Sequence, residues 1–255
     1  MTLPLLISLL PALGLGAVLG LFGGLFGIGG GIFAIPVLVL GFGMDQATAQ
    51  GTALVMMVPN LLVAWWRYVR RNPGGLKGAF GVAVVATLTT WAAASVAQGL
   101  NQGALQMVFA LFLAVLGLGQ LRPRPEEAPA AAPPRLPARL LPLVGIVGGS
   151  SMGLLGVGGG LVATPFLTAF FGLSQKVAQS LALALVTPSS AMALSTYASH
   201  GRLDWHVGAA LGLGGIATVE AGVALAHTWS DRALRRAFAL MLIVTAAVLV
   251  ARRLI

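Results

Sequence analysis

Long apolar stretches, separated by short polar or charged connections, make up most of this chain of 255 residues. Five apolar segments come first, at Leu3–Leu25, Ile32–Phe42, Gln46–Trp66, Leu76–Ala97 and Leu105–Leu121. Five more follow, at Leu140–Leu155, Leu161–Leu173, Val177–Ala198, Val207–Ala226 and Leu234–Val250. Several reach the roughly 20 residues that an α-helix needs to cross a bilayer. The pattern therefore predicts an all-α integral membrane protein.

Composition supports this prediction and excludes several classes of protein. The chain is 58% hydrophobic and 8% charged, whereas a soluble domain carries roughly 25% charged residues. Its net charge of +9 is gathered in short clusters beside the apolar segments, so we expect no nucleic-acid partner. There is no cysteine, which excludes disulfides and thiolate metal sites. The first basic residue is Arg67, so we interpret the apolar N-terminus as a retained membrane segment rather than a signal peptide.

The chain is an internal duplication. Residues 24–68 align without a gap on residues 153–197, 129 positions later, and 19 of these 45 positions are identical. The matches include paired glycines, prolines and glutamines at fixed offsets, which shared apolar composition does not readily produce. We divide the chain into a first membrane repeat at 1–121, a Pro/Arg-rich linker at 122–139 and a second membrane repeat at 140–255.

The second segment of each repeat is short and follows the glycine-rich motif G-x-G-G-G. Eleven to thirteen helical residues cover roughly half of a 30 Å hydrocarbon layer. Backbone that is not helical occurs at membrane depth only inside protein or along a wet cavity. We therefore predict a broken or re-entrant helix at each motif.

Basic residues predict that the two repeats have opposite orientations. The connection after the third segment carries four basic residues in the first repeat and one, Arg202, in the second. The connection after the fourth segment is uncharged at 98–103 and carries Arg232, Arg235 and Arg236 in the second repeat. Because positive residues stay in the cytoplasm, equivalent connections lie on opposite sides. We expect an inverted repeat with both termini outside the cytoplasm, although the terminal arginines oppose that placement.

The motif glycines are the first candidate substrate-binding residues: Gly27, Gly29, Gly30, Gly31, Gly156, Gly158, Gly159 and Gly160. A nucleotide loop is disfavoured, because no P-loop lysine follows and Asp45 has only Ser174 as its counterpart. Close helix packing through small residues is a serious alternative. The N-terminus of each short helix also exposes N–H groups that suit an anion. Inverted-repeat transporters use such half-helix ends, so we expect one substrate held between both motifs.

Neutral donors beside the motifs complete the candidate site. Gln50, Thr52, Gln179 and Ser180 begin the third segments, where they can either donate to an anion or bond between helices. Glu220 is the only acid inside an expected span. It is a candidate for proton coupling, with structural pairing to a basic group as the alternative. The three histidines have no metal-ligand spacing, so we expect no metal site and no cofactor.

The paired motif G-[IV]-G-G-G-x-x-x-x-P-[FV]-L resembles the TauE/SafE family of membrane permeases, as do the length, the duplication and the linker. The resemblance implies transport of sulfur-containing anions such as sulfite, sulfoacetate or other organosulfonates. Export is the expected direction because a negative cell interior already favours outward movement of an anion. It also implies a multi-pass protein of a bacterial inner membrane, with the lipid bilayer and a small anion as its partners.

Other functions stay open at this point. A passive channel or a metal-cation permease is the alternative, although a cation site should show inward carboxylates and only Glu220 offers one. No pair of catalytic groups occurs in both repeats, so we do not expect an enzyme. The pattern leaves the oligomeric state open, with a homodimer as one candidate.

Overall fold

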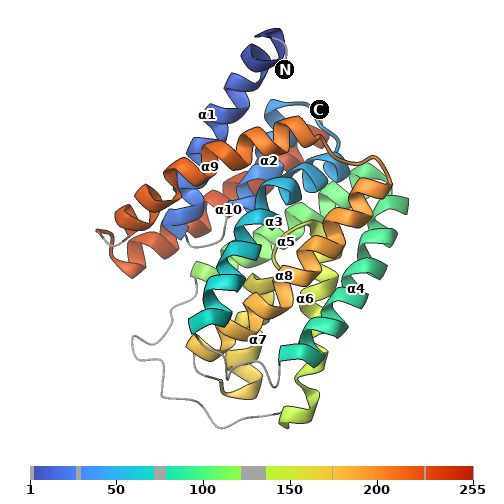
Figure 1. Cartoon of the computed structure of the whole chain (residues 1–255), viewed down its shortest axis with the longest axis vertical. Helices are drawn as coiled ribbons and strands as arrows, with labels where there is room; N and C mark the ends of the chain where they lie inside the picture. Colours follow the sequence, from blue (N-terminus) through green and yellow to red (C-terminus); the bar gives the residue numbers. More distant parts are fainter. Residues whose placement is uncertain are drawn as a thin grey trace. The chain divides into compact units, whose positions relative to one another are not determined.

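The computed structural model describes residues 3–26, 30–71, 79–121, 136–173, 175–226 and 228–254, and every regular element in them is helical (Figure 1). The first repeat contains α1 (Leu3–Phe26), α2 (Gly31–Gly41), α3 (Gln46–Arg71), α4 (Ala79–Gly99) and α5 (Gln102–Leu121). The second contains a short 3-10 helix η2 (Ala138–Leu140), then α6 (Pro142–Leu155), α7 (Gly159–Phe171), α8 (Gln175–Ser199), α9 (Trp205–Ala226) and α10 (Asp231–Leu254). Ten α-helices thus fall where ten apolar segments were predicted.

Helix lengths confirm the integral membrane fold. Within the described residues, α1, α4, α5, α8 and α10 each contain a stretch long and apolar enough to cross a bilayer. The second helix of each repeat is short, with 11 residues in α2 and 13 in α7. Both follow the glycine-rich motif, so the predicted half-length helices are present. The opposite orientation of the repeats stays a prediction.

The helices form two compact units, which do not coincide with the two repeats and are described separately. Unit 1 comprises Met1–Met57, Leu100–Pro123 and Arg202–Ile255, and unit 2 comprises Val58–Gly99 and Arg124–Gly201. Each unit therefore combines helices of both repeats. The chain passes from unit 1 to unit 2 inside α3, one residue before Pro59.

In unit 1, α1 packs along α9 through small residues, and this is the most extensive helix contact of the unit (Figure 1). A methyl group added to Gly16 would overlap the backbone of Leu211, and one added to Gly20 would overlap Gly215. The hydroxyl of Thr218 donates to a carbonyl oxygen of α1. Glycine is needed at both positions because the two backbones touch.

In unit 2, α6 packs along α4 in the same way. A methyl group added to Gly145 would lie 2.6 Å from Val82 O, and one added to Gly149 would overlap Ala86. The hydroxyl of Thr89 donates to Gly145 O at 3.0 Å. Each of these five residues lies 129 positions from its counterpart in the α1–α9 contact. The first helix of each repeat thus packs on the fourth helix of the other repeat, which supports the predicted duplication.

One part of the charge pattern lies on a helix rather than in a loop. The basic residues after α9 belong to the first turns of α10, because Ser230 accepts a hydrogen bond from Ala233 N and begins the helix there. Arg235 donates to Gln120 O at the end of α5. These arginines therefore lie at the start of α10, and Arg235 contacts the end of α5. Helix α10 begins three residues earlier than the apolar pattern indicated.

Candidate functional site

In unit 1 the candidate site is the start of α2, where two glycines carry the chain into the helix. Gly30 has φ +77°, a left-handed conformation that favours glycine, and α2 begins at Gly31. The N–H groups of Phe33 and Ala34 donate to Gly30 O at 3.1 and 3.0 Å. The first turn of a helix cannot satisfy all of its own N–H groups, so this end carries partial positive charge. Gly27 and Gly29 lie outside the described residues.

This helix start lies beside an interior turn of α1. A methyl group added to Gly30 would be 3.0 Å from Leu19 O. Within α1 (Leu3–Phe26), Leu19 lies 16 residues after the first residue and seven before the last. At 1.5 Å per residue, the nearer end of α1 is about 10 Å away. The N-terminus of α2 therefore lies along α1 and not at either of its ends, which fits a half-length helix.

The first turn of α2 is closed by methionines from α3. Residues 30–36 are all buried. The thioether of Met57 lies where a methyl group of Gly31 would be, and Met56 Cε is 3.4 Å from the corresponding position on Gly30. In this unit the motif glycines permit close packing between helices, as one of the two interpretations of the motif predicts. The N-terminus of α2 lies at the same place, in contact with α1 and α3.

The start of α7 in unit 2 also follows a left-handed glycine, but one residue earlier in the repeat. Gly156 ends α6 with φ +67° and Gly158, the counterpart of Gly29, precedes α7 with φ +91°. The N–H of Val162 donates to Gly158 O at 2.9 Å. A methyl group on Gly159 would lie 3.1 Å from Gly148 O, and Gly148 is at the middle of α6. The second half-helix thus also begins beside an interior turn of the helix that precedes it.

The two helix starts differ in access. The first turn of α7 is only partly covered, since Gly160, Leu161 and Val162 have intermediate exposure. A methyl group on Gly160 would lie 3.4 Å from Val186 Cγ2, an ordinary contact. Val186 occupies the position equivalent to Met57. A shorter side chain at this one position leaves more room at the second motif.

The predicted neutral donors are placed differently in the two repeats. Thr52 and Gln50 are fully buried in α3, and Thr52 Oγ1 accepts a hydrogen bond from Asp204 N at 2.9 Å, just before α9 begins. The α3 residues that contact the start of α2 come one turn or more later, at Met56 and Met57. In α8, Gln179 is exposed and Ser180 is half-buried. In the structure Thr52 therefore lies at the start of α9, and the side chain of Gln179 is exposed.

Two buried polar side chains were not selected from the sequence. Gln46, the first residue of α3, is 2% exposed, and Ser189 in α8 is fully buried. In the described part of the chain, neither Gln46 amide atom nor Ser189 Oγ has a hydrogen-bond partner. Buried polar groups are normally paired, so both are candidates to contact substrate or water. The repeated Gln46/Gln175 pair was the available signal for the first, and for the second it was the position of Ser189 directly after Pro188, the counterpart of Pro59.

Glu220 lies on an exposed face of α9 within unit 1, among exposed apolar residues such as Ile216 and Val219. No group of three or more metal-ligating side chains occurs within the ranges that the structure describes. The helix starts themselves offer neutral N–H groups, and the polar side chains predicted for the site are neutral amides and hydroxyls. Such groups suit an oxyanion better than a cation.

Comparison with known proteins gives one family and several relatives. The family model described as Sulfite exporter TauE/SafE matches residues 12–249. A "Probable membrane transporter protein" of Xylella fastidiosa strain 9a5c is 29% identical over 247 residues, covering 94% of each chain. A protein of the same name from strain Temecula1 is equally similar. Another "Probable membrane transporter protein", from Methanocaldococcus jannaschii, is 26% identical over 192 residues, covering 72% of this chain and 69% of its own.

Proposed function

Because this chain belongs to the Sulfite exporter TauE/SafE family and is a membrane transporter, we propose that it carries sulfur-containing anions such as sulfite, sulfoacetate or other organosulfonates. The observation that supports this proposal is the pair of half-helices, α2 and α7, each of which begins beside an interior turn of the helix before it, α1 or α6. The positive dipole end of a half-helix inside the membrane can stabilise an anion without a buried arginine, which would be costly there.

The proposed binding groups in unit 1 are the N–H groups at Gly30 and Gly31, together with the buried amides of Gln46 and Gln50 and the hydroxyl of Thr52. In unit 2 they are the N–H groups that follow Gly158, together with Gln179, Ser180 and Ser189 of α8, the helix that packs against α7. Gly156 forms the left-handed end of α6, and Gly27 and Gly29, also proposed for the site from the sequence, lie outside the described residues. That a single anion is held by both motifs stays a prediction.

Export is the direction that needs no coupling ion. With a negative cell interior, moving one negative charge outward is favourable by roughly 2.3 kcal/mol per 100 mV. Uptake would need a coupled proton or sodium ion. Glu220, as the acid inside a membrane helix, is then the proposed proton site. We place the protein in the bacterial inner membrane, where this potential exists.

A solute screen in proteoliposomes tests the proposal. Purified protein is reconstituted in vesicles with an imposed inside-negative potential, which drives anions outward and cations inward. Efflux of sulfite, sulfoacetate, taurine or sulfate is followed from loaded vesicles, and uptake of a divalent metal ion is followed from the outside. We expect faster efflux than from protein-free vesicles for at least one sulfite or sulfonate anion, and no flux of the metal. Flux of the divalent cation without any sulfur anion would contradict the proposal and favour the cation-permease alternative.

A further inference from the structure

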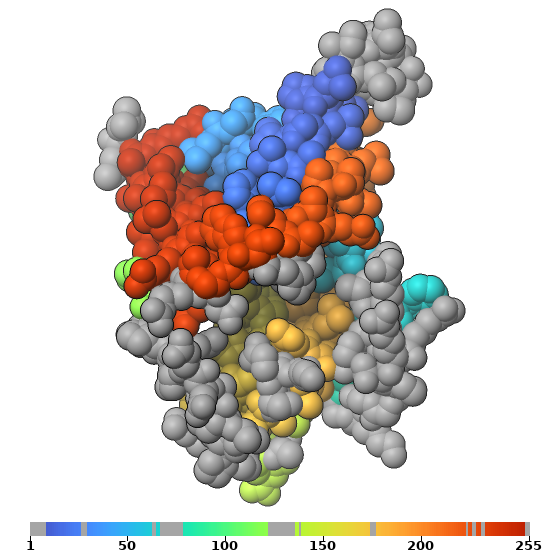
Figure 2. Space-filling model, turned by 90° about the vertical axis from the view of Figure 1, so that its left-hand side faces the viewer, coloured from blue at the N-terminus to red at the C-terminus, as the bar shows by residue number. Residues whose placement is uncertain are grey.

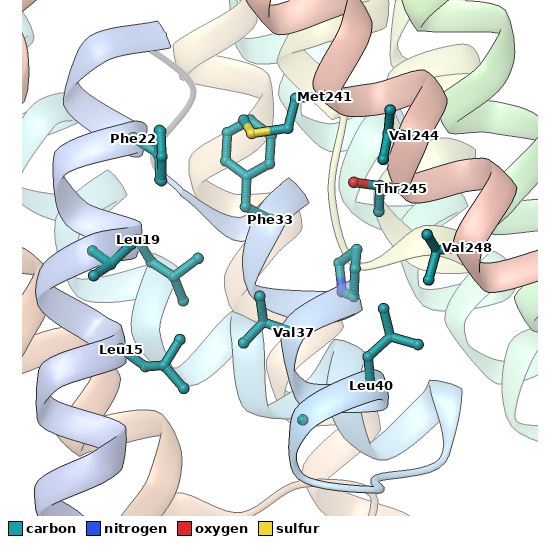
Figure 3. Close-up of a pocket in the computed structure, with 13 residues that line it drawn as sticks. Leu15, Leu19, Phe22, Phe33, Val37, Leu40, Met241, Val244, Thr245 and Val248 are labelled. Carbon is teal, nitrogen blue, oxygen red and sulfur yellow. The ribbon is translucent and has the colours of Figure 1, made fainter. Parts of the chain in front are cut away.

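A groove with apolar walls lies within unit 1, between α1, α2 and α10 (Figure 3). Its volume is about 460 Å³. Of the residues that line it, only Thr245 carries a hydroxyl, and none is charged. Figure 2 shows α2 at the surface of this unit, between α1 and α10. An anion would lose its hydration here without gaining partners, so this groove is distinct from the anion site proposed above.

Aromatic side chains line one end of the groove. Phe22 and Phe33 line it, and Phe26 packs between Phe33 and Phe238, with ring centroids 5.7 and 5.2 Å apart. This end is near the buried start of α2. The walls at this depth offer only hydrocarbon and ring surface.

An arginine lies beside the other end of the groove. Val248 and Leu40 line this end (Figure 3), and Arg252 follows one turn after Val248 on α10. Arg252 Nη1 donates to Val39 O at 2.9 Å and to Leu40 O at 3.1 Å, at the end of α2. The side chain is exposed. A guanidinium has five N–H donors, so the two bonds from Nη1 leave Nε and Nη2 for a further acceptor.

Arg252 lies near the end of α10, two residues before its last residue, Leu254. Basic side chains at the ends of membrane helices extend toward the lipid headgroups. From Val248 to Met241 the groove follows α10 over seven residues, about 10 Å.

We propose that this groove binds a membrane phospholipid, with one acyl chain between α1, α2 and α10 and the headgroup phosphate on Arg252. The apolar walls match the chain, and the phosphate meets a guanidinium that α2 already holds in place. Basic side chains at the ends of membrane helices bind lipid phosphate in this manner. The lipid would brace α2 from its outer side without contact to the anion.

Native mass spectrometry of the full chain in detergent, titrated with palmitoyl-oleoyl phosphatidylglycerol, tests this inference. We expect a first lipid adduct on the wild type. Val37→Trp, which fills the groove, should lose it, and Arg252→Gln should weaken it by about fivefold. Arg236→Gln makes the same charge change on an exposed residue at the start of α10 and should leave the adduct unchanged. Equal adducts in all four proteins, or displacement of the lipid by inorganic phosphate, would overturn the proposal.

A second measurement needs no variant. Wild-type protein in vesicles that contain phosphatidylglycerol with a diazirine near the end of one acyl chain is irradiated, and the labelled peptides are mapped. We expect labels concentrated on the α1, α2 and α10 segments around Phe22, Phe33 and Met241. Labels spread evenly over all membrane-crossing helices, without that concentration, would contradict a defined lipid site.

Discussion

The starts of α2 and α7 both follow a left-handed glycine, Gly30 in one and Gly158 in the other, but they have different surroundings. A methyl group on Gly30 or on its counterpart Gly159 would lie 3.0 or 3.1 Å from a carbonyl oxygen of the preceding helix. The first turn of α2 is buried under methionines, whereas that of α7 is partly open. Both repeats thus have a break before the short helix. The size of the side chain at the equivalent positions Met57 and Val186 determines how much room is left beside the first turn of that helix.

The largest effect should come from glycines that the two units share. Gly20→Ala in α1 and Gly149→Ala in α6 each drive a methyl group into a neighbouring backbone. We expect both to lower the free energy of unfolding by about 1–3 kcal/mol, through overpacking. Thermal unfolding in detergent measures this. Gly14→Ala, with open space around it, is the control and should be neutral or slightly stabilising. A large loss of stability in only one of the two variants would show that the two units do not depend equally on this helix contact.

A smaller effect should separate the two helix starts. Gly31→Ala meets the thioether of Met57, while Gly160→Ala makes only ordinary contacts. We expect Gly31→Ala to cost about 1 kcal/mol of stability and Gly160→Ala to stay within about 0.5 kcal/mol of the wild type. Thermal unfolding is again the measurement. Adding Met57→Ala to Gly31→Ala removes the obstructing thioether, and the double variant should then be less destabilised than the sum of its single changes.

Thr52 has no polar equivalent in the second repeat, where Leu181 stands instead. Its hydroxyl accepts the hydrogen bond from Asp204 N, so Thr52→Val should lower stability by about 1 kcal/mol. Thr52→Ser keeps the acceptor and is the matched control. A stable Thr52→Val protein would show that this bond does not hold the start of α9. Loss of anion flux in a stable variant would assign Thr52 to substrate.

The smallest effect on folding is expected at Glu220, which is exposed on α9 while its counterpart in α4 is the exposed Trp91. Glu220→Gln should change stability by less than about 0.5 kcal/mol. If transport is coupled to protons through this acid, the variant should lose the dependence of flux on an imposed pH gradient. Flux that responds to the gradient as in the wild type would remove Glu220 from the mechanism.

Much of the fold was predictable because apolar length and paired glycines are strong local signals. The short helices and the breaks before them could be predicted from the length of each apolar segment and from the glycines that precede it. The duplication could be predicted from residues repeated at a fixed offset. Gly43 and Gly172 show this well, since both have positive φ at the end of the short helices. The start of α10 was less predictable, because Ser230 extends the helix through charged residues that the apolar pattern assigned to a loop.

The candidate site was predictable only in part. Repetition pointed to both helix starts, but it could not show that Met57 covers one of them or that Thr52 bonds to Asp204, a residue 152 positions away. Such pairings depend on which helices meet, and here the first helix of each repeat meets the fourth helix of the other. The burial of Ser189 and its unpartnered hydroxyl could not be predicted for the same reason, because burial depends on how the helices pack together.

Anion flux through Gly160→Ala tests the central claim most directly. The methyl group fits beside Val186, and side chains on a helix tilt toward its N-terminus, so it would stand where the anion is expected. The matched control is Gly119→Ala in α5, which also has room for a methyl group. In proteoliposomes that contain equal amounts of folded protein, we expect sulfite or sulfonate efflux to fall about tenfold in Gly160→Ala and to stay unchanged in Gly119→Ala. Equal flux in wild type and Gly160→Ala would contradict anion binding at the start of α7.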